Sequence, residues 1–253
     1  MTTYPFRTAL VTGASAGIGE AIARLLAADG VAVTLVARRR DRLQQLADEL
    51  PGSSVLVADL AERAGRNVVA ARLEGAPVEL LVNNAGFGVG SGLLDVSPSQ
   101  LDAQLSVNVA AVIELSRAAA RAMAAAGRGW IINVSSVAGE LPTPHDAGYG
   151  ASKAYVTSFS EAIAVELAPH GVRVTAVLPG YTRTEFHTVS GLDAESIPRW
   201  AWMSAESVAH AALAGSAAGR VVVVPGRRYQ VATAAVRLLP RAALRRISGS
   251  RDR

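Results

Sequence analysis

Residues 8–19 read Thr8-Ala-Leu-Val-Thr-Gly13-Ala-Ser-Ala-Gly17-Ile-Gly19, a short apolar run that passes directly into a glycine-rich turn. Apolar residues then recur at helical spacing as far as Asp29, so the turn joins a strand to a helix. Glycines permit a tight turn and let the backbone approach a pyrophosphate at the helix N-terminus. A second apolar run ends about 20 residues further on, which favours a dinucleotide site over an ordinary strand–helix turn.

The same alternation of strands and helices continues to about residue 224. Strands are predicted over 8–11, 31–36, 55–57, 80–82, 130–134, 172–177 and 221–224, and helices over 17–29, 41–50, 62–73, 99–126, 149–168 and 205–214. Repeated strand–helix units imply a parallel sheet with helices on both faces. We therefore predict a single Rossmann-like, doubly wound α/β domain with a parallel seven-stranded sheet over residues 1–226. Its ligand site should lie beyond the carboxyl ends of the strands.

The composition sets limits on function. The chain has 253 residues, half of them hydrophobic, and it has no cysteine, so disulfides and thiolate metal sites are excluded and we assign no metal ligands. Residues 1–8 are too short and too polar for a signal peptide, and no apolar run reaches the roughly 18 residues of a membrane span. We therefore expect a cytoplasmic protein.

The positive charge is concentrated at the C-terminus. Residues 227–253 carry eight arginines and one acid, a net charge of +7 in a chain whose total is +4, which leaves −3 for the rest. The body therefore gives no electrostatic reason to expect a nucleic-acid partner.

The basic tail, residues 227–253, has amphipathic spacing. Its arginines recur every four residues, Pro240 suits the first turn of a second helix, and the apolar positions share one side: Val231, Ala235, Leu238 and Leu239. We predict two short helices. Their apolar side is expected to pack on the body or on a partner subunit in preference to an anionic membrane surface, although basic amphipathic helices can also dock there.

The end of the second predicted strand bears on cofactor choice. An NAD site usually has an acid here for the ribose 2′-hydroxyl, but this chain has Ala37 followed by Arg38. A guanidinium matches a 2′-phosphate in charge and geometry, and Ser15 can add a hydroxyl contact. We predict NADP. The neighbouring arginines fit a solvated cluster that opens the next helix: Arg40, Arg42 and, on one reading, Arg39.

Lys153 is the only lysine among 25 basic residues. It follows Tyr149 by four residues, so on a helix the two side chains share one face. A compact ammonium beside a phenol favours the phenolate and lowers its pKa, which lets the tyrosine act as a general acid or base. A surface Tyr–Lys pair is the plain alternative. The chain retains a single lysine at this position, where the wide guanidinium of arginine would fit poorly, and this argues against a plain surface pair.

Four motifs occur in order: the glycine turn, Asn83-Asn84-Ala85-Gly86, Asn133-Val134-Ser135-Ser136 and Tyr149-x-x-x-Lys153. With them the chain resembles the short-chain dehydrogenase/reductase family over residues 8 to about 224. The resemblance implies that four residues are catalytic: Asn108, Ser136, Tyr149 and Lys153. It also implies cofactor contacts from Gly13, Ser15, Ala16, Gly17, Ile18, Gly19, Arg38, Asp59, Leu60, Asn84, Ala85, Gly86, Tyr149, Lys153, Pro179, Gly180, Thr182 and Thr184.

The resemblance also implies a mechanism and an assembly. NADPH presents a hydride to a carbonyl carbon, Tyr149 protonates the carbonyl oxygen, and Ser136 hydrogen-bonds to that oxygen. Lys153 grips the nicotinamide ribose and tunes Tyr149, while Asn108 anchors a proton-relay water. The family pairs the helices over 99–126 and 149–168 into homodimers or homotetramers.

Residues 185–203 resemble the mobile substrate lid of the family. Their apolar content indicates a bulky or greasy carbonyl substrate, with ordinary packing as the alternative: Ile197, Trp200, Trp202 and Met203. We predict NADPH-dependent reduction of a ketone or aldehyde, reversible as alcohol oxidation. The alternatives are a 3-oxoacyl thioester reductase of fatty acid or polyketide synthesis and, of another class, a non-enzymatic nucleotide-sensing or membrane-surface protein. The presence of both Tyr149 and Lys153 argues against the latter.

Overall fold

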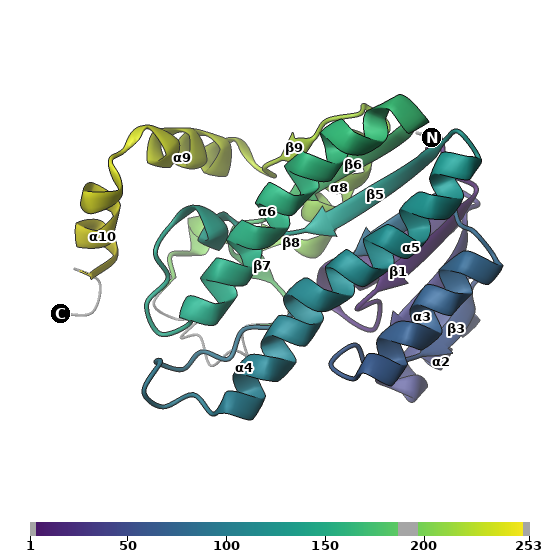
Figure 1. Ribbon diagram of the computed structural model, residues 1–253, viewed down its shortest axis with the longest axis horizontal. Helices are drawn as coiled ribbons and strands as arrows, with labels where there is room; N and C mark the ends of the chain where they lie inside the picture. The colour runs from purple at the N-terminus through teal and green to yellow at the C-terminus, as the bar shows by residue number, and fades with distance from the viewer. Residues whose placement is uncertain (1–3, 187–196, 250–253) are drawn as a thin grey trace.

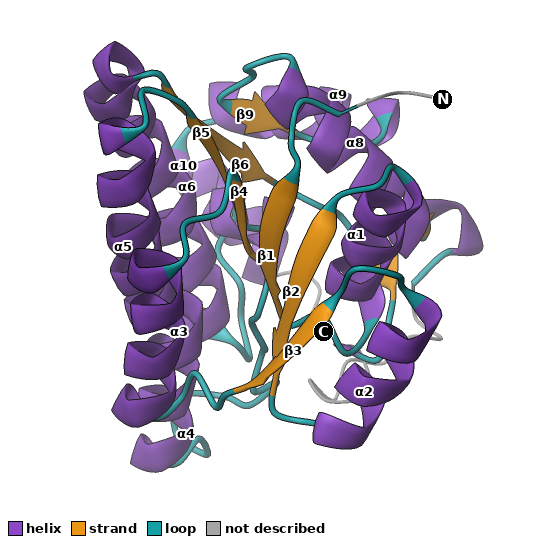
Figure 2. Ribbon diagram, turned by 90° about the vertical axis from the view of Figure 1, so that its right-hand side faces the viewer, coloured by secondary structure: helices purple, strands orange, loops and turns teal. Residues whose placement is uncertain are grey.

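The fold is built on one parallel sheet, seen in a computed structural model that describes residues 4–186 and 197–249. Within these residues, seven strands lie in the order β3-β2-β1-β4-β5-β6-β9 (Figure 2). Their bounds are β1 Thr8–Thr12, β2 Ala32–Ala37, β3 Ser54–Val57, β4 Leu80–Asn83, β5 Gly129–Val134, β6 Val172–Val177 and β9 Val222–Val223. The predicted Rossmann-like α/β fold with a seven-stranded parallel sheet is confirmed.

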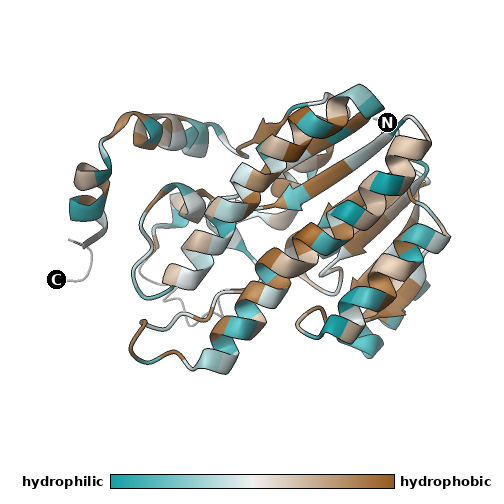
Figure 3. Ribbon diagram, in the orientation of Figure 1, coloured by the Kyte–Doolittle hydropathy of each residue, from teal (hydrophilic) through white to brown (hydrophobic). Residues whose placement is uncertain are grey.

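Helices cover both faces of the sheet (Figure 2). One face packs against α1 Gly17–Ala28, α2 Arg40–Glu49 and α8 Ala205–Ala217, and the other against α3 Arg63–Gly75, α5 Ala111–Ala125 and α6 Ala147–Leu167. Successive strand residues point to opposite clusters: Val11 joins the first and Leu10 the second. Strands buried on both faces are therefore mostly apolar, as the prevailing brown of the strands in Figure 3 shows.

The predicted helix over 99–126 contains an irregular turn. It consists of α4 Pro98–Leu105, a π-helical turn η1 Ser106–Ala110, and then α5. Ser97 and Gln100 start α4 with a reciprocal capping box, in which each side chain accepts the backbone N–H of the other. The π turn inserts one extra residue per turn and often marks a functional site; here it carries Asn108.

The remaining elements are short. They are η2 Val137–Glu140, η3 Ala168–His170, η5 Arg199–Ala201, and the strands β7 Thr182–Arg183 and β8 Met203–Ser204, which pair with each other in a second, unpredicted sheet. None of the helices within the described residues combines the length and apolar character needed to cross a bilayer.

The basic tail forms the two predicted helices, α9 Arg227–Leu238 and α10 Arg241–Gly249, separated at Pro240. In Figure 1 they lie on the side toward which the strand arrows point. The apolar side does not pack on the body, because Val231 is 71% and Leu238 is 86% exposed, so that part of the prediction is wrong. Packing of this side on a partner subunit stays a prediction. The body instead holds α9 by polar contacts, among them a 2.7 Å ion pair between Arg237 and Glu140.

Candidate active site

A cavity of about 1230 Å³ lies beyond the carboxyl ends of the strands, where sheets of this kind bind ligands. Segments that follow β1 to β6 border it, together with residues of α9. All of the predicted site residues except Gly19 and Asn108 line this cavity: Gly13, Ser15, Ala16, Gly17, Ile18, Arg38, Asp59, Leu60, Asn84, Ala85, Gly86, Ser136, Tyr149, Lys153, Pro179, Gly180, Thr182 and Thr184.

The glycine turn forms a cradle from which side chains are excluded. Gly13 and Gly17 have φ angles of 66° and 60°, a region that favours glycine. A Cβ on Gly19 would lie 2.4 Å from the carbonyl oxygen of Gly13, so Gly19 supports the turn without lining the cavity. Ala16 precedes α1 without a side-chain cap, which leaves the first helical amides available to an anion. This arrangement fits a pyrophosphate.

Side chains tie the glycine turn to the loop after β4, at the point where the strand order reverses. The hydroxyl of Thr12 accepts hydrogen bonds from the backbone N–H groups of Asn84 and Ala85, both at 3.0 Å. The Asn84 amide donates in return to the Thr12 carbonyl at 3.0 Å. The two loops that border the cofactor end of the cavity are therefore held together.

Ser136, Tyr149 and Lys153 meet on one wall of the cavity, between the end of β5 and the first turns of α6. Asp146 begins α6 by accepting the backbone N–H of Tyr149 at 3.3 Å. The Lys153 Nζ lies 5.6 Å from the centre of the Tyr149 ring and donates to the Val134 carbonyl at 2.8 Å. The structure thus brings together three groups that the sequence placed in two separate motifs.

Burial controls the protonation of this pair. Burial raises the pKa of Tyr149 to about 12, and this effect is larger than the lowering of the pKa by a hydrogen bond from Ser136. Burial also lowers the pKa of Lys153 to about 8. The expected lowering of the phenol's pKa is therefore wrong, because the effect of burial outweighs that of the hydrogen bond from Ser136. Tyr149 is held as the protonated phenol, the form that can donate a proton.

Asn108 lies fully buried in the π turn, behind the cavity wall. Its side-chain Nδ2 donates to the Phe87 carbonyl at 2.9 Å and to the Ser152 hydroxyl at 3.1 Å, while its Oδ1 accepts the Phe87 N–H at 3.0 Å. A Cβ on Gly86 would lie 3.1 Å from both Asn108 Oδ1 and Lys153 Nζ, so these groups are close neighbours. Asn108 fixes the loop after β4 beside the lysine, and its contact with a water stays a prediction.

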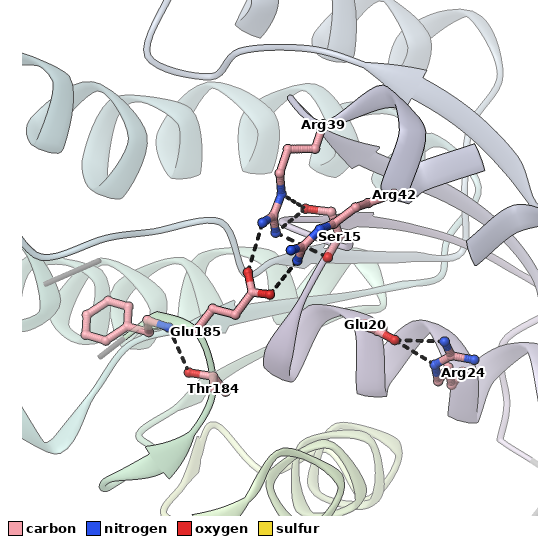
Figure 4. A network of polar contacts seen from close by, with 8 residues as sticks. Ser15, Glu20, Arg24, Arg39, Arg42, Thr184 and Glu185 are labelled. Carbon is pink, nitrogen blue, oxygen red and sulfur yellow. Dashed lines mark hydrogen bonds and ion pairs between the residues drawn. The ribbon is translucent and has the colours of Figure 1, made fainter. Parts of the chain in front are cut away.

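The arginines after β2 are arranged differently from the sequence expectation (Figure 4). Arg38 lines the cavity, but its side chain is 70% exposed and its contact with Asp59 is long, at 3.8 Å. Arg39 also lines the cavity and donates to the hydroxyl of Ser15 at 3.0 Å. Arg39 and Arg42 therefore do not form a merely solvated cluster, since both pair with Glu185.

Aromatic side chains form the other end of the cavity. The Phe186 ring lies 5.4 Å from the ring of Tyr149. Tyr229 of α9 donates its hydroxyl to the Ala201 carbonyl at 2.8 Å and accepts the N–H of Tyr181 at 3.0 Å. A Cβ on Gly180 would lie only 2.0 Å from the Tyr229 ring, so this glycine permits the contact. Sequence reasoning missed Phe186 and Tyr229; no local pattern marks a tyrosine that bonds 48 residues away.

The predicted lid over 185–203 is described only at its two ends, and residues 187–196 lie outside the described part of the chain. The pairing of β7 with β8 brings these ends together, with Thr182 opposite Met203. Trp200 and Trp202 both line the cavity, and Trp200 is 67% exposed beneath the guanidinium of Arg228.

Known proteins match both the sequence and the structure. The short chain dehydrogenase family model matches residues 7–194. A "Very-long-chain 3-oxoacyl-CoA reductase" of Anas platyrhynchos is 35% identical over 192 residues, which are 72% of this chain and 62% of that relative, so the chain matches less than two thirds of its length.

Solved structures agree over most of the chain. A short-chain dehydrogenase of Sphingobium yanoikuyae in complex with NADPH has a TM-score of 0.84 and 34% identity, covering 90% of this chain and 92% of that one. A "bulky-bulky ketone specific alcohol dehydrogenase" of Comamonas testosteroni has a TM-score of 0.79 and 31% identity, covering 95% and 97%. With this fold, this cavity and a family match over most of its length, the chain belongs to the short-chain dehydrogenase/reductase family and is an oxidoreductase.

Proposed function

We propose that the protein reduces a ketone or aldehyde with NADPH and, in reverse, oxidises the alcohol. The observation that carries this proposal is that Ser136, Tyr149 and Lys153 share one wall of the cavity that contains the glycine cradle. A carbonyl held at Tyr149 would therefore face the space that a nicotinamide would reach. The bound dinucleotide supplies the hydride, and the protein supplies position and proton.

The residues divide the work as follows. Tyr149 holds a proton at its phenol oxygen and gives it to the carbonyl oxygen as negative charge develops there. Ser136 orients the same oxygen with its hydroxyl. Lys153, fixed by the Val134 carbonyl, places a cation next to the phenol and stabilises the phenolate once the proton has left. Phe186, packed on the Tyr149 ring, helps to exclude water from this corner.

The preference for NADPH is supported by the charge at the end of β2. Ala37 offers no acid to a ribose 2′-hydroxyl, while Arg38, Arg39 and Ser15 all line the cavity there. A structural relative binds NADPH. Guanidinium groups match a 2′-phosphate dianion better than a hydroxyl.

The substrate is proposed to be apolar or bulky, because aromatic and proline side chains line the cavity around Tyr149: Phe87, Pro142, Phe186, Trp200 and Trp202. A relative specific for bulky-bulky ketones has a similar fold over nearly the whole chain. A 3-oxoacyl thioester is the second candidate. The name of one curated relative and the position of Arg227 and Arg228 on the cavity wall favour it, since these cations could meet an anionic carrier.

A panel of matched ketones, aldehydes and 3-oxoacyl thioesters, with NADPH consumption followed by absorbance, tests the function. Tyr149→Phe should lower turnover by about 100- to 10,000-fold, the usual contribution of a positioned general acid. Lys153→Arg should lose nearly all turnover, because a guanidinium does not fit the ammonium's place. Tyr155→Phe is the matched control, since this half-exposed tyrosine of α6 does not line the cavity. Turnover of Tyr149→Phe within a few-fold of the unmodified protein would reject the mechanism.

We also propose that the chain forms a homodimer or homotetramer through the helices α4, α5 and α6. Two of these helices, α4 and α6, expose large apolar side chains: Leu105 and Val165. Light scattering on the full chain and on Leu105→Glu and Val165→Glu variants tests this, and unchanged mass in both variants would contradict it. The two tail helices, α9 and α10, are proposed as a separate unit that covers the substrate end.

A further inference from the structure

A single carboxylate pairs with two arginines at the cofactor end of the cavity (Figure 4). Arg39 donates to Glu185 at 2.8 Å, and Arg42 bonds to the other oxygen of the same carboxylate. Glu185 is 146 residues away from Arg39 in the sequence, on the segment that follows β7. The contact therefore joins the two sides of the cavity.

The contact between Arg39 and Glu185 lies beside the glycine turn, at the wall of the cavity. Arg39, Ser15 and Glu185 all line the cavity, and the Arg39 guanidinium bonds to both the hydroxyl and the carbonyl oxygen of Ser15 in the glycine turn. Arg38, in contrast, is mostly exposed, and among the described residues its ion-pair partner, Asp59, lies 3.8 Å away. The cation that touches the cofactor cradle is thus Arg39, and the anion it holds is a carboxylate from the protein.

We propose that Glu185 competes with the 2′-phosphate of NADPH for Arg39 and Arg42, so that these three side chains set cofactor affinity in addition to Arg38. This inference rests on the proposed NADPH preference. A carboxylate and a phosphate monoester offer guanidinium groups the same kind of acceptor oxygens, and the phosphate carries about −1.5 to −2 charge. The phosphate is therefore the stronger partner when both are present.

The contact is weak enough to be exchanged. The side chains of Arg39, Arg42 and Glu185 are 44%, 48% and 49% exposed, and exposed ion pairs contribute little because water screens them. The two arginines nevertheless hold the pKa of Glu185 below its usual range, so the carboxylate stays ionised at neutral pH. Glu185 thus acts as a resident anion that NADPH displaces and that NADH, with no phosphate here, does not need to displace.

The test is calorimetric binding of adenosine 2′,5′-bisphosphate and of 5′-AMP to the full chain, which involves neither the nicotinamide nor the substrate. Glu185→Gln should tighten the bisphosphate by about 3- to 10-fold, the value of one or two exposed ion pairs, and leave 5′-AMP within about twofold. Arg39→Gln should weaken the bisphosphate by about 10-fold. In the Arg39→Gln background, the gain in bisphosphate affinity from Glu185→Gln should be smaller, because one of the two cations for which Glu185 competes has been removed.

Glu20→Gln is the matched control. Glu20 pairs with Arg24 on α1 at 2.8 Å and does not line the cavity, so this variant removes the same charge without touching the site. Unchanged or weaker bisphosphate binding by the Glu185→Gln variant would overturn the inference. An equal gain in bisphosphate affinity in the Glu20→Gln variant would also overturn it, because it would indicate only an effect of long-range charge. Equal affinity of the unmodified protein for NADPH and NADH would reject the proposed cofactor preference itself, a separate result.

Discussion

The buried ammonium of Lys153 should make stability depend on pH in a predictable direction. Lys153 is 4% exposed, and burial lowers its pKa from 10.5 to about 8. As pH rises from about 8 toward 10.5, the folded protein releases this proton while the unfolded chain still holds it. The free energy of unfolding should therefore increase over that window, at about 1.4 kcal/mol per pH unit. Between pH 7 and pH 9.5 the expected gain is about 2 kcal/mol.

Urea unfolding of the unmodified protein and of Lys153→Met at both pH values measures this gain. The methionine variant has no titrating group here, so its stability should change by about 2 kcal/mol less between the two pH values. Because the chain has one lysine, ¹⁵N-lysine labelling gives a single Nζ signal, whose midpoint should lie near 8. A midpoint at 10 or above, with parallel stability profiles, would refute the reasoning.

Three further changes test other parts of the site. Gly180→Ala should destabilise the fold by about 1–3 kcal/mol and speed hydrogen exchange in α9, because the new Cβ displaces Tyr229. The control is Gly75→Ala, whose Cβ meets nothing within 4 Å and should change neither stability nor exchange. Arg38→Asp should weaken NADPH binding by about 10- to 150-fold and erase or invert the preference for NADPH over NADH. Equal binding of NADPH and NADH by the unmodified protein would contradict the role of Arg38. Replacing Trp200 and Trp202 with Ala should raise the KM for bulky ketones more than for small ones, and equal effects would indicate structural packing.

The parallel sheet and the shared helix face of Tyr149 and Lys153 could be predicted because they depend on local patterns. Strands buried on both faces must be apolar, and the spacing from Tyr149 to Lys153 is fixed by one helical turn. The π turn around Asn108 was missed, since helical periodicity does not register one extra residue. The pairing of β7 with β8 was missed because two-residue strands have no period.

The rest depended on contacts between distant parts of the chain. The pairs Arg39–Glu185 and Tyr181–Tyr229 form only when the loops converge, so no sequence window contains both partners. The protonation of Lys153 and Tyr149 also required the structure, because burial and the hydrogen bond from Ser136 act in opposite directions on the pKa of the phenol, and only the packed fold decides between them.

The contact of Tyr229 with Gly180 has a consequence for how such a chain can diversify. The glycine cradle and the loop after β4 that is tied to it lie within the first hundred or so residues. The far end of the cavity is bordered by residues that come after the last strand: Tyr229, Ala232 and Val236. A terminal segment can be lengthened, shortened or exchanged without rearranging a sheet. Grafting the residues after Pro225 from one relative onto another is therefore a route by which substrate range could be inherited separately from cofactor use.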